Sequence, residues 1–73
     1  MIQELDTVAL TVDLPEYGLT RGDIGYVVLV HQEGKAYEVE FMTLEGNTIA
    51  VTTLLESQVR AVQPREIAHA RAI

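Results

Sequence analysis

Hydrophobic and polar positions along this chain alternate with a period near two, in short runs separated by glycine or proline. Such a period places successive side chains on opposite faces of a β-strand, whereas a helix would repeat every 3.6 residues. Five runs fit this description: residues 5–11, 26–30, 36–41, 48–54 and 59–62. Their spacing, with turn residues between them, predicts an all-β domain.

The alternation also predicts which side chains form the core. In and just after the first run, Val8, Leu10 and Val12 are expected to point inward and Asp6 to lie near the rim. The third run alternates most regularly, so its apolar residues should face in while Glu38 and Glu40 face out. The expected core residues of these two runs are Val8, Leu10, Val12, Tyr37, Val39 and Phe41.

The second run, residues 26–30, is the most hydrophobic segment and is expected to be the central strand, with Tyr26 in the core. Gly22 and Gly25 precede it and supply either backbone freedom or close approach of the backbone. In the fourth run, Ile49 and Val51 should share one face. The other face of that run should carry Thr48, Ala50 and Thr52.

The connections between the runs predict the topology. Residues 14–19 contain Pro15 and Gly18, which interrupt a regular strand and predict a long ordered loop. Residues 32–35 and 44–47 have hairpin composition, and residues 55–58 are short enough for a single 3₁₀ turn. With the last run returning to the first, the prediction is a small five-stranded SH3-like barrel over residues 1–63.

The C-terminal tail, residues 64–73, changes to an alanine-rich composition after Pro64. This predicts a short helix or a disordered end, because so short a helix is marginal without packing. Two alternatives are open: a frayed terminus, or a segment that becomes ordered against a partner or a neighbouring subunit.

Length and charge narrow the classes of function. A chain of 73 residues without cysteine forms one domain with a small core and has no thiolate metal site or disulfide. Eleven acidic against five basic residues give a net charge of −6, which disfavours direct binding to nucleic acid. The acidity fits either a basic protein partner or simple solubility. With no membrane-spanning run or secretory signal, a cytoplasmic location is expected.

No group of residues predicts catalysis, a cofactor or a metal. His31 and His69 are far apart in sequence and lack companion ligands. Ser57 lacks the turn that exposes a nucleophilic serine, so we expect it to cap a helical turn. Glu38 and Glu40 resemble a pair of catalytic acids but are expected on a solvated face. The chain is therefore not expected to be an enzyme.

Two features suggest an interaction surface. Tyr17 in the 14–19 loop and Tyr26 at the start of the second run are candidates for a peptide groove. In the alternative, Tyr17 pins its loop against the domain and Tyr26 packs in the core. The acidic residues of the two hairpins can form a negative face suited to a basic partner. The candidate partner-binding residues are Tyr17, Glu33, Glu38, Glu40 and Glu45.

Several separated blocks occur in an order that resembles the small bacterial proteins of the domain of unknown function 4926 family. The blocks are residues 4–10, 14–19, 22–25, 36–41 and 46–50, and the resemblance covers residues 4–62. It implies an SH3-like barrel and membership of a toxin–antitoxin or immunity pair, and it supplies no binding or catalytic residue. The expected function is a non-enzymatic protein-binding module that inhibits a genetically linked toxin. The alternative is an accessory module that docks on a larger enzyme or ribonucleoprotein complex.

Overall fold

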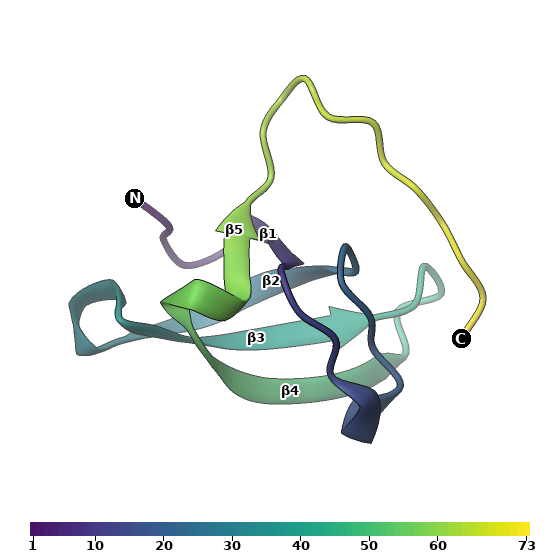
Figure 1. Ribbon diagram of the computed structural model, residues 1–73, viewed down its shortest axis with the longest axis horizontal. Helices are drawn as coiled ribbons and strands as arrows, with labels where there is room; N and C mark the ends of the chain where they lie inside the picture. The colour runs from purple at the N-terminus through teal and green to yellow at the C-terminus, as the bar shows by residue number, and fades with distance from the viewer.

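The computed structural model describes residues 1–73 and contains one five-stranded antiparallel sheet in the order β4-β3-β2-β1-β5 (Figure 1). The strands are β1 (Thr7–Leu10), β2 (Ile24–His31), β3 (Ala36–Met42), β4 (Thr48–Leu55) and β5 (Val59–Ala61). Three 3₁₀ turns connect them: η1 (Pro15–Tyr17), η2 (Gln32–Gly34) and η3 (Glu56–Gln58). The all-β class is confirmed, and β2 is the central strand as predicted. None of the helical segments is long and apolar enough to cross a membrane.

The last strand returns to the first, as the sequence predicts. β5 pairs antiparallel with β1, placing Val8 opposite Ala61, while β1 also pairs with β2. In Figure 1, β3 and β4 run horizontally and β5 stands upright across them, so the sheet is strongly twisted. β4 and β5 lie at the two ends of the strand order, so the sheet has two edges and does not close on itself.

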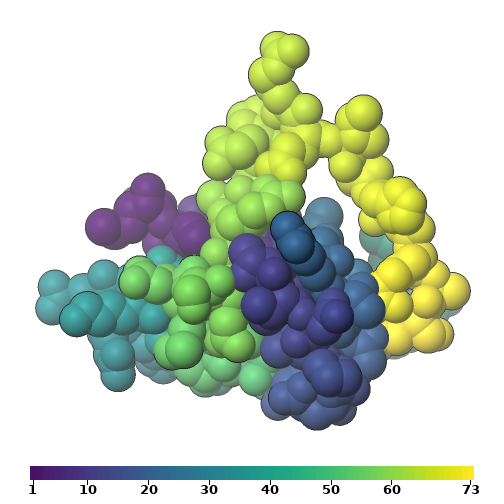
Figure 2. Space-filling view, viewed as in Figure 1, coloured from purple at the N-terminus to yellow at the C-terminus, as the bar shows by residue number.

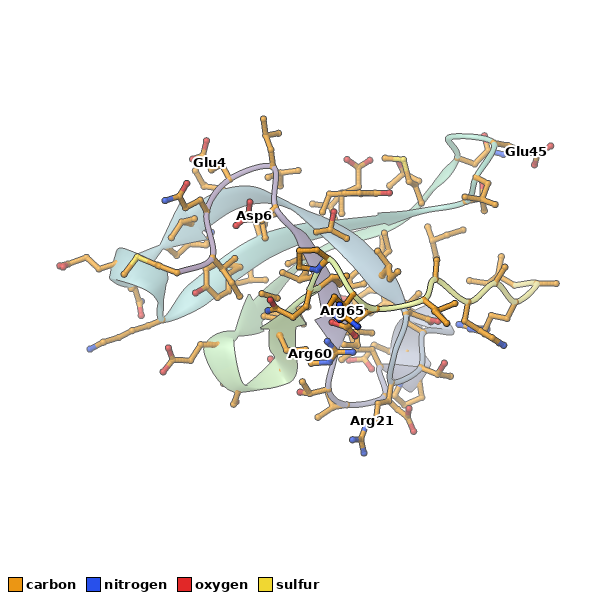
Figure 3. All side chains as sticks on the ribbon, turned by 90° about the horizontal axis from the view of Figure 1, so that it is seen from above. Glu4, Asp6, Arg21, Glu45, Arg60 and Arg65 are labelled. Carbon is orange, nitrogen blue, oxygen red and sulfur yellow. The ribbon has the colours of Figure 1, made fainter.

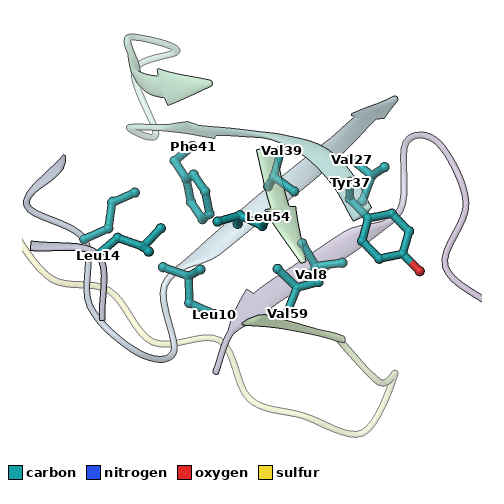
Figure 4. Packing of buried hydrophobic residues seen from close by; sticks show 10 residues of the cluster. Val8, Leu10, Leu14, Val27, Tyr37, Val39, Phe41, Leu54 and Val59 are labelled. Atoms are coloured by element: carbon teal, nitrogen blue, oxygen red, sulfur yellow. The ribbon is translucent and has the colours of Figure 1, made fainter. Parts of the chain in front are cut away.

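One hydrophobic cluster lies on the concave side of this sheet. Figure 4 shows side chains of β3 facing those of β1 and β5, with Leu54 of β4 between them. The cluster consists of Val8, Leu10, Leu14, Leu19, Val27, Tyr37, Val39, Phe41, Leu54 and Val59. Five of the six core residues expected in the first and third runs belong to it. Val12 does not: it is 36% exposed, because β1 ends at Leu10 and the chain then leaves the sheet.

Tyr26 corrects the expectation for the second run, because its side chain is 42% exposed rather than in the core. The inward positions at this end of β2 are Gly25 and Val27. A Cβ atom on Gly25 would lie 2.7 Å from Val39 Cγ1 and 2.8 Å from Phe41 Cε1. Gly25 therefore admits the Phe41 ring against the β2 backbone, and Tyr26 points the other way because successive residues alternate.

Two register shifts change which side chains share a face. Between Val27 and Leu29 the pairing of β2 with β3 shifts, so that Leu29 lies opposite Glu38. A second shift at Phe41 and Met42 displaces the start of β4. We expected Thr48 on the face of Ala50, but its hydroxyl instead reaches Glu40 on the opposite face. Such bulges insert one residue and reverse the alternation beyond it.

The 14–19 loop is ordered, as predicted. Leu14 and Leu19 form an isolated antiparallel bridge, and both side chains are buried in the core. Gly18 has a φ of +71° and closes η1 through its N–H, which donates to Pro15 O. The loop is thus a folded arm of the domain whose base is anchored by two leucines.

The C-terminal tail contains no helix, which corrects the helical alternative. It leaves β5, arches over the body and meets it again near its end, as Figures 1 and 2 show. Two ion pairs hold the tail. In the first, the Arg60 guanidinium donates to both carboxylate oxygens of Glu66. This pairing, together with the Gln63 N–H, lowers the pKa of Glu66 to about 2. The second ion pair joins Arg71 to Asp23.

Candidate protein-binding surface

The face of the sheet opposite the core, here called the outer face, is built from three rows across β2, β3 and β4. Cross-strand pairing aligns one residue from each strand, and residues in one row are direct neighbours. The rows are Tyr26–Glu40–Val51, Leu29–Glu38–Thr53 and His31–Ala36–Leu55. The first two rows therefore each have a carboxylate on β3, the middle one of these three strands.

Threonine hydroxyls hold both carboxylates in place. Thr48 Oγ1 donates to Glu40 Oε2 at 2.6 Å, and Thr53 Oγ1 donates to Glu38 Oε1. Both glutamates are half-buried, so their side chains lie down on the sheet rather than extending into solvent. A hydrogen bond to a carboxylate restricts its rotamers, which lowers the entropy lost when a partner binds it.

Apolar side chains surround these carboxylates and are unusually exposed. Val51 and Leu55 are more than half exposed, and Tyr26 and Leu29 are close to that value. Contiguous exposed apolar side chains on a small domain mark sites of association more often than scattered ones do. The outer face thus combines apolar contact area with two oriented negative charges.

Six charged residues can be located in the view from above. Figure 3 shows the labelled acids Glu4, Asp6 and Glu45 along one side and the labelled arginines toward the other. The Arg60 guanidinium forms an ion pair with Glu66.

Only two of the five predicted binding residues lie together. Glu38 and Glu40 are next to each other on the outer face, whereas Glu33 in η2 and Glu45 in the β3–β4 turn lie beyond opposite ends of β3. Tyr17 lies elsewhere: its hydroxyl is 3.3 Å from Thr52 Oγ1. Thr52 pairs with Val39 on the core side of β4, so Tyr17 pins its loop to that strand.

Leu29, Val51 and Leu55 of the outer face were not predicted as binding residues from the sequence, and Tyr26 was expected in the core or in a peptide groove. Tyr26 and Leu29 belong to an uninterrupted apolar run, which contains no polar residue to show which side chains face solvent. A weak signal existed in the third run, because its outward glutamates must have outward neighbours on both adjacent strands. The bulge between Val27 and Leu29 could not be located in this way.

The two histidines lie on different segments of the chain. His31 Nε2 lies 4.0 Å from Glu38 Oε1, while His69 is in the tail. No group of three or more His, Cys, Asp or Glu residues is placed to hold a metal ion. Ser57 does not cap η3, because Gln58 Oε1 accepts the Leu55 N–H there; Ser57 O instead accepts the Thr11 hydroxyl.

Comparison with known families agrees with the pattern of sequence blocks. Residues 4–61 match the family described as Domain of unknown function (DUF4926), and the chain belongs to this family. The match ends at the last residue of β5, so it includes the whole sheet and leaves out the C-terminal tail. Neither a curated protein nor a solved structure matches the chain.

Proposed function

We propose that this protein is a non-enzymatic, cytoplasmic protein-binding module whose outer face binds a basic surface of a partner protein. Its most concrete form is an antitoxin or immunity protein that inhibits a toxin encoded by a neighbouring gene. The observation that carries this proposal is the pair of carboxylates, Glu38 and Glu40, oriented by threonine hydroxyls within exposed apolar side chains.

Each part of the outer face has a role in such binding. Arginine or lysine side chains of the partner would form charge-assisted hydrogen bonds with the two carboxylates. Long-range attraction to a chain of net charge −6 accelerates encounter with a basic surface. The surrounding Tyr26, Leu29 and Val51 would supply apolar contact, and aromatic residues at the centre of an interface often contribute most of the binding energy.

We also propose that the open sheet is a partly open SH3-like barrel. The strand order, the return of β5 to β1 and the 3₁₀ turn η3 between β4 and β5 support this assignment. Such a frame leaves the outer face of β2, β3 and β4 free, while the 14–19 loop covers the core side.

The binding proposal is tested with the purified product of the neighbouring gene and a charge-reversal pair. Glu38→Lys with Glu40→Lys should weaken binding at least about 100-fold in calorimetry, because two attractions become repulsions. The matched control is Glu16→Lys with Glu56→Lys, which changes the net charge equally at exposed positions of η1 and η3. This control should retain affinity within about fivefold.

Equal losses in both double variants would show that only net charge matters and would contradict the outer face as the binding site. Expression of the neighbouring gene alone distinguishes the two biological roles. Growth arrest that this protein relieves supports toxin inhibition. Stable binding without any toxicity would instead indicate an accessory module on a larger complex.

A further inference from the structure

A cleft of about 560 Å³ separates the end of the C-terminal tail from the sheet. Its sheet side includes Ile24, Tyr26, Met42 and Ile49, together with Phe41 of the core. The other side is formed by residues 68–73 of the tail. Because this volume is left open between the two, the mostly apolar sheet side of the cleft is not closely packed by the tail.

One end of the cleft holds a guanidinium group. Arg71 Nε donates to Asp23 Oδ1 at 2.8 Å, and Arg71 Nη2 donates both to Asp23 Oδ2 and, at 3.0 Å, to Gly18 O. The planar guanidinium matches this arrangement of acceptors in a way that a lysine ammonium would not. Its hydrogen bonds hold the pKa of Asp23 below its ordinary value, although partial burial acts in the opposite direction.

The acceptors belong to the body of the domain and do not depend on the tail. Asp23 Oδ2 also accepts the Thr20 N–H at 2.8 Å, and the Asp23 N–H donates to Thr20 O. Gly18 is positioned by the end of η1, where its N–H is bonded to Pro15 O. The arginine site is therefore preformed at the junction of the 14–19 loop and β2.

The tail is a poor occupant of this site. Beyond Glu66, no backbone N–H of the tail takes part in a backbone hydrogen bond, and Ile67 is 95% exposed. The tail side of the cleft includes the small side chains of Ala68, Ala70 and Ala72, alongside His69, Arg71 and Ile73. Small side chains leave unfilled volume, and filling it adds apolar burial at about 25 cal/mol per Å².

We propose that this cleft is a binding site for an extended segment of a partner protein that carries an arginine next to bulky apolar residues. The arginine takes the place of Arg71 between Asp23 and Gly18, and the apolar residues take the places of Ala70 and Ala72. The tail is then the chain's own, replaceable occupant. The cleft does not include Glu38 or Glu40 of the outer face. Tyr26 lines the cleft and also belongs to the outer face.

The test uses the full-length protein and a fluorescent peptide with the sequence of residues 66–73, in which Ala70→Leu and Ala72→Leu replace two of the three alanines. Arg71→Ala in the protein releases its own tail, which otherwise competes at a high effective concentration. We expect this variant to bind the peptide at least about tenfold more tightly than the wild type, measured by fluorescence anisotropy.

Two further substitutions identify the site. Adding Asp23→Asn to the Arg71→Ala protein should weaken peptide binding at least about tenfold, because the carboxylate partner of the arginine is lost. Adding Glu16→Gln instead removes a negative charge from the 14–19 loop. Glu16 does not line the cleft, so this substitution should leave binding unchanged. The unsubstituted tail peptide should bind more weakly than the leucine peptide.

Three results would overturn the proposal. The first is equal binding by the wild type and the Arg71→Ala protein. The second is binding that survives Asp23→Asn, with folding of every variant verified by its amide NMR spectrum. The third is a wild-type dimer that becomes a monomer in Arg71→Ala, which would assign the cleft to the tail of a second copy.

Discussion

Gly25 is the glycine at which an added methyl group would come closest to neighbouring atoms. Replacing it with alanine places a Cβ within 3 Å of atoms of Val39 and Phe41, both buried in the core. Because these side chains lie in a close-packed interior, they cannot move away without losing contacts of their own. We expect Gly25→Ala to lower the free energy of unfolding by about 1–3 kcal/mol, measured by urea denaturation.

Gly22 provides the control for this prediction. It has a φ of +94°, and a Cβ there would meet no atom within 4 Å. Gly22→Asn adds more atoms than Gly25→Ala but at an open position, and asparagine tolerates positive φ better than most residues. Its effect on stability should be smaller than that of Gly25→Ala. The reverse order would contradict the proposed packing of Phe41 against the β2 backbone.

At the scale of single residues, sequence alternation predicted burial well only where polar residues marked the solvent side. Tyr37, Val39 and Phe41 alternate with glutamates and are buried as expected. Tyr26 lies in a run that is apolar on both faces, so the pattern could not orient it. Val12 continued the alternation of the first strand in sequence, but the chain had already turned out of the sheet.

Among the elements, the edge strand β4 is the least protected against pairing with another chain. It has eight residues, none of them charged and none proline, and it pairs only with β3. The opposite edge, β5, has three residues with Arg60 at its centre. Short length and charge are the usual protection of sheet edges, and β4 has neither.

This difference predicts where aggregation begins when the protein is heated. Val51→Lys introduces a charge at the middle of β4, directly opposite Glu40 on β3. The new cross-strand ion pair should keep the melting temperature close to that of the wild type while slowing light scattering above it. Glu56→Lys makes a larger charge change in η3, outside the strand, and serves as the control. Equal protection by both variants would contradict β4 as the site of aggregation.

Element types were predicted more reliably than their ends and irregularities. The five strands, the two hairpin connections and the 3₁₀ turn near residue 56 follow the sequence pattern. The two bulges do not, because each depends on how neighbouring strands fit together. The tail has helical composition but is extended, since its ion pairs with the body replace the hydrogen bonds that a short helix would gain.

At the scale of the whole molecule, the tail joins distant parts of the chain through ion pairs that respond to acid. The pKa of Asp23 is lowered below its ordinary value of 3.8 when Arg71 is bonded to it. A group whose pKa is lowered in the docked state favours docking above its ordinary pKa. That contribution is lost as the pH falls through the lowered value. Glu66, with a pKa of about 2 in place of 4.5, follows the same direction.

We therefore expect the NMR signal of the Arg71 Nε–H, which donates to Asp23, to remain constant from neutral pH to about pH 5 and to move toward its free-chain position below pH 3.8. Asp23→Asn should place this signal at its free-chain position already at neutral pH. A signal that responds to acid equally in this variant would show that Asp23 does not hold the tail.

The strand order also affects the order in which strands pair during folding. β2, β3 and β4 are joined by short turns, so their pairing requires little loss of loop entropy. The pairing of β1 with β5 brings residue 8 to residue 61 and becomes favourable only once the intervening strands are in place. We therefore expect β2, β3 and β4 to form the folding nucleus, which φ-values of substitutions in these strands would test. The outer face proposed to bind a partner would then form before the domain is complete.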